Sequence, residues 1–470
     1  MTTRGQIPAD VIHEILVLLS DFSTLSAAIR VSKSFYDTFQ ARPNLIVHAV
    51  LNNAVGPALP QAARLEQYKE NVASTEDPRI LTLPNEEHFR GSHLKLTRAS
   101  AMSMERSANA VRILEDFYSI RFKDRSCRSS RLDPKESLRF GRAMYRYWLC
   151  YELLKNVAFT YKPGEDDDED EDDEDDEDGY QAPHNNDEEE GLDKDRRLTR
   201  DGFLTEFTHL PSEELFEILE MCTFLKDTET WMGKAYWKSY YAYDAYIHTP
   251  WTPVDPMQLA RHVEAHRPQE DYFRGYSDND LIPNAARRVL RLRKVPEDRL
   301  ADPNLRVIVT SANGSQDCCS RCQAVCGTGL FGSTNMFLLG GLIGSGEQTA
   351  LLPGALHRNR DEMRLLQYHI KNTQRLIATE TIVHEMMAME PEGEDTDGEQ
   401  WSKDEWYCME CIKQLFRNRF MLWWREAKRQ GGAPAQDDCW YGYNCRTMTH
   451  RSAHAMKLNH LCKPTRGEAP

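Results

Sequence analysis

Cysteine side chains gather in the second half of this 470-residue sequence, where eight of its 12 cysteines lie between Cys318 and Cys445. Thiolate and imidazole groups are the protein ligands that zinc prefers. The first residues lack the apolar stretch of a signal peptide, and close spacing of cysteines in an intracellular chain favours metal binding over a disulfide framework. Zinc is therefore the cofactor that we expect.

The densest group of candidate ligands lies near the C-terminus, within 22 residues. Five residues separate its two cysteines, and five separate its two histidines. Because zinc takes four such ligands in a tetrahedron, this spacing predicts one zinc site. Its expected ligands are Cys439, Cys445, His454 and His460. His450 and Cys462 are alternative ligands at the same site.

This segment resembles the poly(ADP-ribose)-binding zinc finger, PBZ, in which Cys-x-Tyr-Gly-x-x-Cys precedes His-x5-His. The resemblance implies a finger over residues 431–463, with adenine stacking near Tyr441. Eight residues separate Cys445 from His454, more than in the family, and Arg446-Thr447 replaces an aromatic–basic pair. We therefore expect a structural or protein-docking role, ahead of ADP-ribose or RNA binding at Tyr441 and Arg446.

Two Cys-x-x-Cys knuckles form a second candidate zinc site. Each knuckle brings two thiolates to one side of an ion, so a pair of knuckles can complete a tetrahedron. In this chain 85 residues separate the two knuckles, which consist of Cys319, Cys322, Cys408 and Cys411. Cys318 and Cys326 are substitute ligands, and the alternative is a set of free buried thiols.

Apolar residues at helical spacing mark residues 1–55, where we expect three short helices. Ile7-Pro8 opens the first helix, and Asp21 to Thr24 ends it and caps the next. A module of this size cannot bury all of its apolar side chains, so part of its surface should be left for a partner.

This module resembles the F-box. The matching features are an apolar–Pro pair, an Ile-Leu pair, a leucine before the break, and a valine four residues before a large aromatic, here Phe35 in place of tryptophan. Residues 43–60 also resemble fungal F-box-like proteins. The resemblance implies docking on the adaptor subunit of SCF-type cullin–RING ubiquitin ligases. The residues expected at that contact are Ile7, Pro8, Ile12, Ile15, Leu16, Leu19, Val31 and Phe35. The alternative is an ordinary three-helix cap on the following domain.

Negative charge is concentrated in residues 163–197, which hold 20 acidic and 3 basic side chains, a net charge of −17. The chain as a whole carries −16, so the remainder is at +1. The 14 carboxylates from Glu165 to Asp178 are unbroken and have nothing apolar to bury. The pattern predicts a disordered acidic linker, which acts as a spacer or as a dock for basic partners.

The remaining pattern predicts a mainly α fold, with helical regions over 56–162 and 198–430. Helices are expected at 108–122, 138–158, 210–219, 363–387 and 408–429, and one strand is expected at 306–310.

Gly327 to Gly332 fits the dinucleotide-binding pattern G-x-G-x-x-G, but it follows a cysteine knuckle instead of a strand, so we do not interpret it as a nucleotide site. The sequence has no phosphate-loop, serine-hydrolase or zinc-protease motif. Its longest uncharged apolar run, residues 336–344, is too short to cross a bilayer, so we expect no membrane partner and a location in the cytoplasm or nucleus. We expect a non-enzymatic F-box-type adaptor, a substrate receptor for an unidentified protein target. The alternative is a nucleic-acid or poly(ADP-ribose) binding protein without a ligase role.

Overall fold

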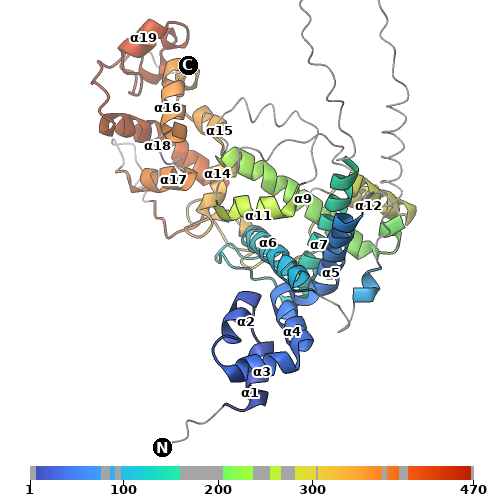
Figure 1. Cartoon of the computed structure of the whole chain (residues 1–470). Coiled ribbons are helices and arrows are strands. Elements are labelled where there is room, and N and C mark those ends of the chain that lie inside the picture. Colours follow the sequence, from blue (N-terminus) through green and yellow to red (C-terminus); the bar gives the residue numbers. More distant parts are fainter. Residues whose placement is uncertain are drawn as a thin grey trace, which may run out of the picture.

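The computed structural model describes residues 7–75, 85–89, 97–158, 205–236, 254–265, 281–302, 305–372, 378–390 and 401–466. The predicted acidic linker at 163–197 lies outside these residues. Within them the fold is mainly helical, as predicted, with one two-stranded sheet. Figure 1 shows α1–α4 at one end of the molecule, α16–α19 at the other, and α5–α12 between them.

The N-terminal module, residues 7–55, contains four helices: α1 (Ala9–Val17), α2 (Phe22–Ala28), α3 (Lys33–Ala41) and α4 (Pro43–Val55). Asp21 caps α2 by accepting a hydrogen bond from the Thr24 backbone N–H at 2.7 Å. The helices enclose a small core of their own, formed by Ile12, Leu16, Leu25, Ile46 and Val50. Because Leu51, the next residue of α4, belongs to the larger core of the molecule, α4 joins the module to the body.

The body consists of α5 (Leu59–Ser74), α6 (Arg98–Phe122), α7 (Pro134–Ala158), α9 (Ser212–Tyr236), α11 (Pro256–Ala265), α12 (Leu281–Leu292) and α13 (Glu297–Leu300). The long helix α7 packs against α9, and α6 packs against α11. Residues 56–162 and 198–430 therefore share one core, although the acidic segment separates them in the chain.

The C-terminal part contains α14 (Leu339–Leu342), α15 (Ser345–Ala350), α16 (Arg360–Asn372), α17 (Thr379–Ala388), α18 (Met409–Gln430) and α19 (Ser452–Lys457). Two short strands, β1 (Leu330–Phe331) and β2 (Tyr407–Cys408), pair antiparallel with Leu330 opposite Cys408. The helix expected over 363–387 falls in α16 and α17, with residues 373–377 outside the described part.

The prediction of a strand over residues 306–310 is wrong, because these residues form no strand. Their backbone N–H groups bond to buried carboxylates instead of to a neighbouring strand. Glu220 accepts from Val307 and Ile308 at 2.6 and 3.0 Å, and Glu136 accepts from Thr310 at 2.8 Å. The β-branched residues thus lie in an irregular segment that is held by carboxylates of helices α7 and α9.

Among the described residues, no helix is both long enough and apolar enough to cross a membrane.

Candidate metal centres

The two cysteine knuckles meet in space and form the four-cysteine group: Cys319, Cys322, Cys408 and Cys411. Their sulfur atoms all lie within 4.8 Å of one another. The Sγ atoms of Cys319 and Cys411 are 3.6 Å apart, as are those of Cys322 and Cys408. Four thiols at this separation could hold a metal ion, and they are too far apart for disulfides.

Backbone hydrogen bonds hold the two knuckles in register. Within the first knuckle, the Cys319 N–H donates to the Ala324 carbonyl and the Gln323 N–H donates back to Cys319, both at 2.9 Å. The Ser320 N–H donates to the Trp406 carbonyl at 2.8 Å, so the second knuckle is tied to the first. The pairing of β1 with β2 then places Cys408 at the end of a strand, and α18 carries Cys411 in its first turn.

The surroundings of the four-cysteine group favour a thiolate at Cys319. Burial acts to raise the pKa of this thiol, but hydrogen bonds from the backbone N–H groups of Cys322 and Cys408 outweigh it and bring the pKa to about 6. Burial and the neighbouring sulfurs raise the pKa of Cys411 instead. Because a cation between the thiols would stabilise their charged forms, this group suits a metal ion. Neither Cys318 nor Cys326, the substitute ligands, belongs to the group.

A second set of side chains forms the finger group: Cys439, Cys445, His454 and His460. Nε2 of His454 lies 3.3 Å from the Cys445 sulfur and 3.8 Å from the Cys439 sulfur. The ring of His460 lies beside that of His454, with centroids 5.1 Å apart. The group could hold a metal ion.

His460 is only 1% exposed, and its ring nitrogens make no well-formed hydrogen bond among the described residues, although a backbone contact with Leu458 acts to raise its pKa. Burial and the neighbouring His454 lower its pKa, which favours the neutral, ligating form of the imidazole. Buried polar atoms nearly always have a partner, so a ring nitrogen left without one beside two thiols points to a bound cation. The alternative ligands lie outside the group: His450 is exposed, and the Cys462 thiol donates to the Asn459 carbonyl at 3.5 Å.

The finger segment, residues 437–466, folds around these ligands through a few backbone contacts. The Cys439 N–H donates to the Asn459 carbonyl at 2.9 Å, which brings the cysteine loop beside the histidines. Gly442 has a φ of +43°, and a Cβ there would lie 2.2 Å from the Cys462 carbonyl oxygen. Only glycine permits this close turn.

The finger segment packs on the helices before it. The Ala355 N–H donates to the Tyr443 carbonyl at 2.9 Å, and α19 packs against α16. Cys439 and Cys445 belong to the large core of the molecule. The finger is therefore attached to the body by apolar contacts as well as by the chain. Figure 1 shows α19 beyond the ends of α16 and α18.

The predicted ligand-binding residues lie at the surface of the finger segment. Tyr441 is 50% exposed and Arg446 is also exposed. Arg466 was not predicted, yet its guanidinium lies 4.0 Å from the centroid of the exposed Trp440 ring. The sequence offers little reason to select Arg466, because its position after the last expected zinc ligand does not show where its side chain lies.

The residues predicted to bind a partner in the N-terminal module divide into two sets. Ile12 and Leu16 are buried in the core of the module, and Leu19 and Phe35 are half-buried against it. The exposed set consists of Ile7, Pro8, Ile15 and Val31. Val11, which belongs to the apolar stripe predicted from the sequence, is 47% exposed, and Leu18, which was not predicted, is 75% exposed. Helical spacing finds apolar residues but does not say which face of α1 meets the core.

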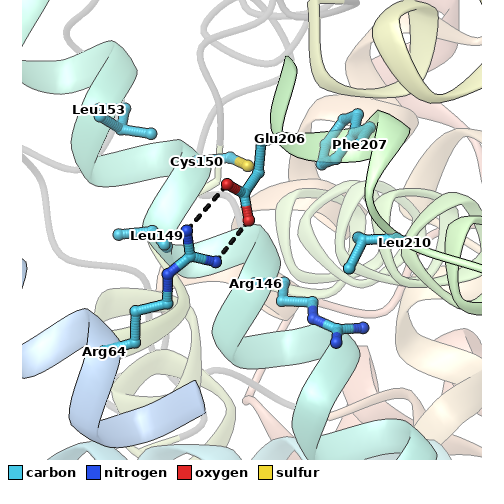
Figure 2. A pocket seen from close by; sticks show the side chains of 8 residues that line it. All are labelled: Arg64, Arg146, Leu149, Cys150, Leu153, Glu206, Phe207 and Leu210. Carbon is cyan, nitrogen blue, oxygen red and sulfur yellow. Dashed lines mark hydrogen bonds and ion pairs between the residues drawn. The ribbon is translucent and has the colours of Figure 1, made fainter. Parts of the chain in front are cut away.

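A pocket between α5, α7 and residues 205–210 is lined by Arg64, Arg146, Leu149, Cys150, Leu153, Glu206, Phe207 and Leu210 (Figure 2). Arg64 forms a bidentate ion pair with Glu206 inside it. The pocket has room for about one water molecule, so it is not a ligand site. The ion pair joins residues that precede and follow the acidic segment.

Comparison of the chain with models of protein families, with curated proteins and with solved structures finds no match.

Proposed function

We propose that this protein is an F-box-type adaptor, a substrate receptor of an SCF cullin–RING ubiquitin ligase, in which zinc stabilises the C-terminal part. The observation that carries the proposal is an apolar stripe on the outer face of the first helix. Ile7, Val11, Ile15 and Leu18 are 50%, 47%, 39% and 75% exposed. Val11, Ile15 and the C-cap residue Leu18 follow one another at intervals of four and three residues, which is one face of a helix, and Ile7 precedes the N-cap residue Pro8.

The exposed stripe is separate from the apolar residues with which α1 packs into the module's core. The adjacent face of α1 supplies Ile12 and Leu16 to a closed core, so the helix has a second apolar face that this core does not bury. Val31, Tyr36 and Leu45 add exposed apolar area on the turn before α3, on α3 and on α4. An exposed apolar surface of this kind is typical of a protein–protein interface.

The geometry of the four-cysteine group supports zinc as its metal. With Zn–S bonds of about 2.3 Å, two ligands of a tetrahedron lie roughly 3.8 Å apart. The observed sulfur–sulfur distances of 3.6 Å fit that edge. In the finger group, the sulfur–nitrogen distances of 3.3 and 3.8 Å lie on either side of the edge of roughly 3.5 Å expected for one sulfur and one nitrogen ligand. Both are closed sites of four protein ligands, typical of structural rather than catalytic zinc.

In this proposal the two ends of the molecule have different binding partners. The N-terminal module docks on the ligase adaptor, and the zinc-stabilised C-terminal part holds the protein target. The connection through α4, whose Leu51 belongs to the larger core, would hold the target in a set position relative to the ligase.

Affinity purification of the tagged full-length chain from its native cell, followed by identification of the bound subunits, tests the function. We expect the adaptor and the cullin to co-purify with the wild-type chain. They should be absent with the double variant Val11→Glu, Ile15→Glu, and present with Leu365→Glu, a matched change at a 52% exposed leucine on α16. Failure of the wild-type chain to capture the adaptor would refute the proposal.

A second candidate is a poly(ADP-ribose)-binding protein without a ligase role. The exposed Tyr441 and Arg446, beside the finger group, favour it. Retention of the chain on poly(ADP-ribose), lost in Tyr441→Ala, together with an absence of the ligase adaptor, would support this candidate over the first.

A further inference from the structure

The finger segment is a positively charged region on an acidic chain. Residues 437–466 hold five cationic and two acidic side chains, a net charge of +3, whereas the whole chain carries −16. All five cations are exposed, and none of them forms an ion pair within the described part of the chain. They are Arg446, Arg451, Lys457, Lys463 and Arg466. This unneutralised charge indicates an anionic partner.

One part of this surface combines the charge with an exposed aromatic ring. The Trp440 side chain is 60% exposed, although the Arg466 guanidinium lies 4.0 Å from its ring centroid. The N–H groups of Thr465 and Arg466 donate to the Trp440 carbonyl at 2.8 and 2.9 Å, which fixes the chain beside the indole. Lys463 lies in the same short segment and is exposed. We call Trp440, Lys463 and Arg466 the Trp440 platform.

We propose that the Trp440 platform binds single-stranded nucleic acid. An unpaired base stacks on the indole, and the neighbouring phosphates pair with Lys463 and Arg466. Base–aromatic stacking accepts any base, so the site is tolerant of sequence. In a duplex each base is already stacked on its neighbours, which leaves none for the indole. An acidic peptide would use the two cations but would leave the apolar ring in water.

This site does not depend on the ligase role, and it differs from the ADP-ribose site that the PBZ resemblance implies at Tyr441 and Arg446. The three platform residues come from outside the ligand set, so they can be changed without removing a metal ligand. Because they are exposed, their replacement should leave the zinc content unchanged, which a metal analysis of each variant checks.

Fluorescence anisotropy of short labelled oligonucleotides, titrated with the zinc-loaded full-length chain, tests the proposal. Single-stranded RNA and DNA should bind, and a duplex of the same length should bind far more weakly. Trp440→Ala should weaken single-strand binding about tenfold or more, while Trp440→Phe should retain most of it. Replacing Lys463 and Arg466 together by Gln should reduce the slope of log affinity against log salt by about 1.4. The matched controls on α3, Tyr36→Ala and Lys33→Gln, should change nothing.

Several results would overturn the proposal. These are no binding of either single strand, equal binding of the duplex, unchanged binding by Trp440→Ala, or a Phe variant as weak as the Ala variant. Polyglutamate that binds with the same dependence on Trp440 would make the platform an acidic-protein site instead. Binding of poly(ADP-ribose) alone, lost in Tyr441→Ala and kept in Trp440→Ala, would place the only ligand site at Tyr441.

Discussion

The environment of His460 helps to distinguish a metal site from an ordinary apolar core. An imidazole that is 1% exposed and has at most one backbone partner, Leu458, among the described residues leaves a ring nitrogen unsatisfied, which is unfavourable by about 1–3 kcal/mol. A metal ion bound at one nitrogen would remove much of that penalty and would explain why a polar ring occupies an apolar position. The thiols of Cys439 and Cys445 complete the explanation, because they approach the neighbouring His454 at ligand–ligand distances.

Replacement of His460 by Leu distinguishes the two interpretations. If His460 were a plain core residue, the apolar replacement would be neutral or stabilising, because an unsatisfied polar group is removed. We expect instead that zinc falls from two ions to one per chain and that the melting temperature decreases. Metal analysis by mass spectrometry measures the stoichiometry. His450→Leu, at an exposed histidine outside the group, should retain both ions.

Gly442 provides a second prediction at this scale. Its φ is positive, and a Cβ added there would lie 2.2 Å from the Cys462 carbonyl oxygen, which leaves no space for a side chain. Gly442→Ala should therefore open the loop between Cys439 and Cys445 and weaken zinc binding at the finger group by about tenfold or more. Competition with a chromophoric chelator measures the affinity. Gly432→Ala, at a positive φ where a Cβ meets nothing within 4 Å, controls for backbone strain alone; equal loss in both variants would contradict the steric explanation.

At the scale of elements, the helices of the body hold the segment that leads to the first knuckle. The carboxylate of Glu136, at the start of α7, accepts hydrogen bonds from Lys123 Nζ at 3.0 Å and from the Thr310 N–H at 2.8 Å. Burial acts to raise the pKa of Glu136, but hydrogen bonds from the Asp133 backbone and from Thr310 outweigh it and bring the pKa to about 2. Glu136 thus connects α6, α7 and the chain that reaches Cys319.

The depressed pKa of Glu136 predicts a specific pH dependence. A carboxylate whose pKa falls on folding stabilises the protein above its unfolded pKa near 4.5, and this contribution is lost as the pH falls toward 2. Glu136→Gln should lower the free energy of unfolding by about 2–3 kcal/mol at pH 7, because it leaves Lys123 buried without its charge partner.

Denaturant unfolding of wild type and variant at matched pH values measures this difference. It should narrow steadily below pH 4.5. Because any zinc release in acid occurs in wild type and variant alike, its effect cancels in the difference between their free energies of unfolding. A difference that stays constant down to pH 3 would show that the ionised form of Glu136 is not what stabilises the fold. Glu410→Gln, at an exposed ion pair with Lys413, should change little.

Sequence patterns predict some of these elements and not others, for physical reasons. The helices that contain residues 108–122 and 409–429 follow from apolar periodicity, since one face of each is buried. The segment 306–310 looks like a strand because its residues are β-branched, but carboxylates from two helices take its N–H groups. The grouping of Cys319 with Cys411 follows as a hypothesis from the knuckle pattern, whereas the short strands that align them carry no periodicity to detect.

At the scale of the whole molecule, helix α18 connects the four-cysteine group at its start with the finger group that follows its end. Cys411 lies in the first turn of α18, and the finger segment follows its last residue, Gln430. The buried face of α18 packs on α17, and its Lys428 pairs with Glu362 of α16 at 2.9 Å. A change at either metal group should therefore reach the other through a rigid helix. The N-terminal module keeps a separate core.

Removal of the metal should destabilise the C-terminal part far more than the N-terminal module. Structural zinc contributes its binding energy to folding, so chelation should lower the melting temperature by about 10 °C or more. Differential scanning calorimetry with and without chelator measures the shift, and hydrogen exchange locates it. Exchange in α18 and α19 should rise, while exchange in α1 and α4 should stay unchanged. An unaltered melting temperature after complete removal of zinc would contradict a structural role.

The central claim is that the exposed stripe of α1 docks on the ligase adaptor, and calorimetric titration of the purified full-length chain with the purified adaptor subunit tests it most directly. Wild type and Leu365→Glu should bind equally, with a negative heat-capacity change that marks the burial of apolar surface. Val11→Glu with Ile15→Glu should bind at least a hundredfold more weakly while its melting temperature stays the same, because both side chains are exposed. No heat of binding with the wild-type chain, or equal binding by the double variant, would contradict the account.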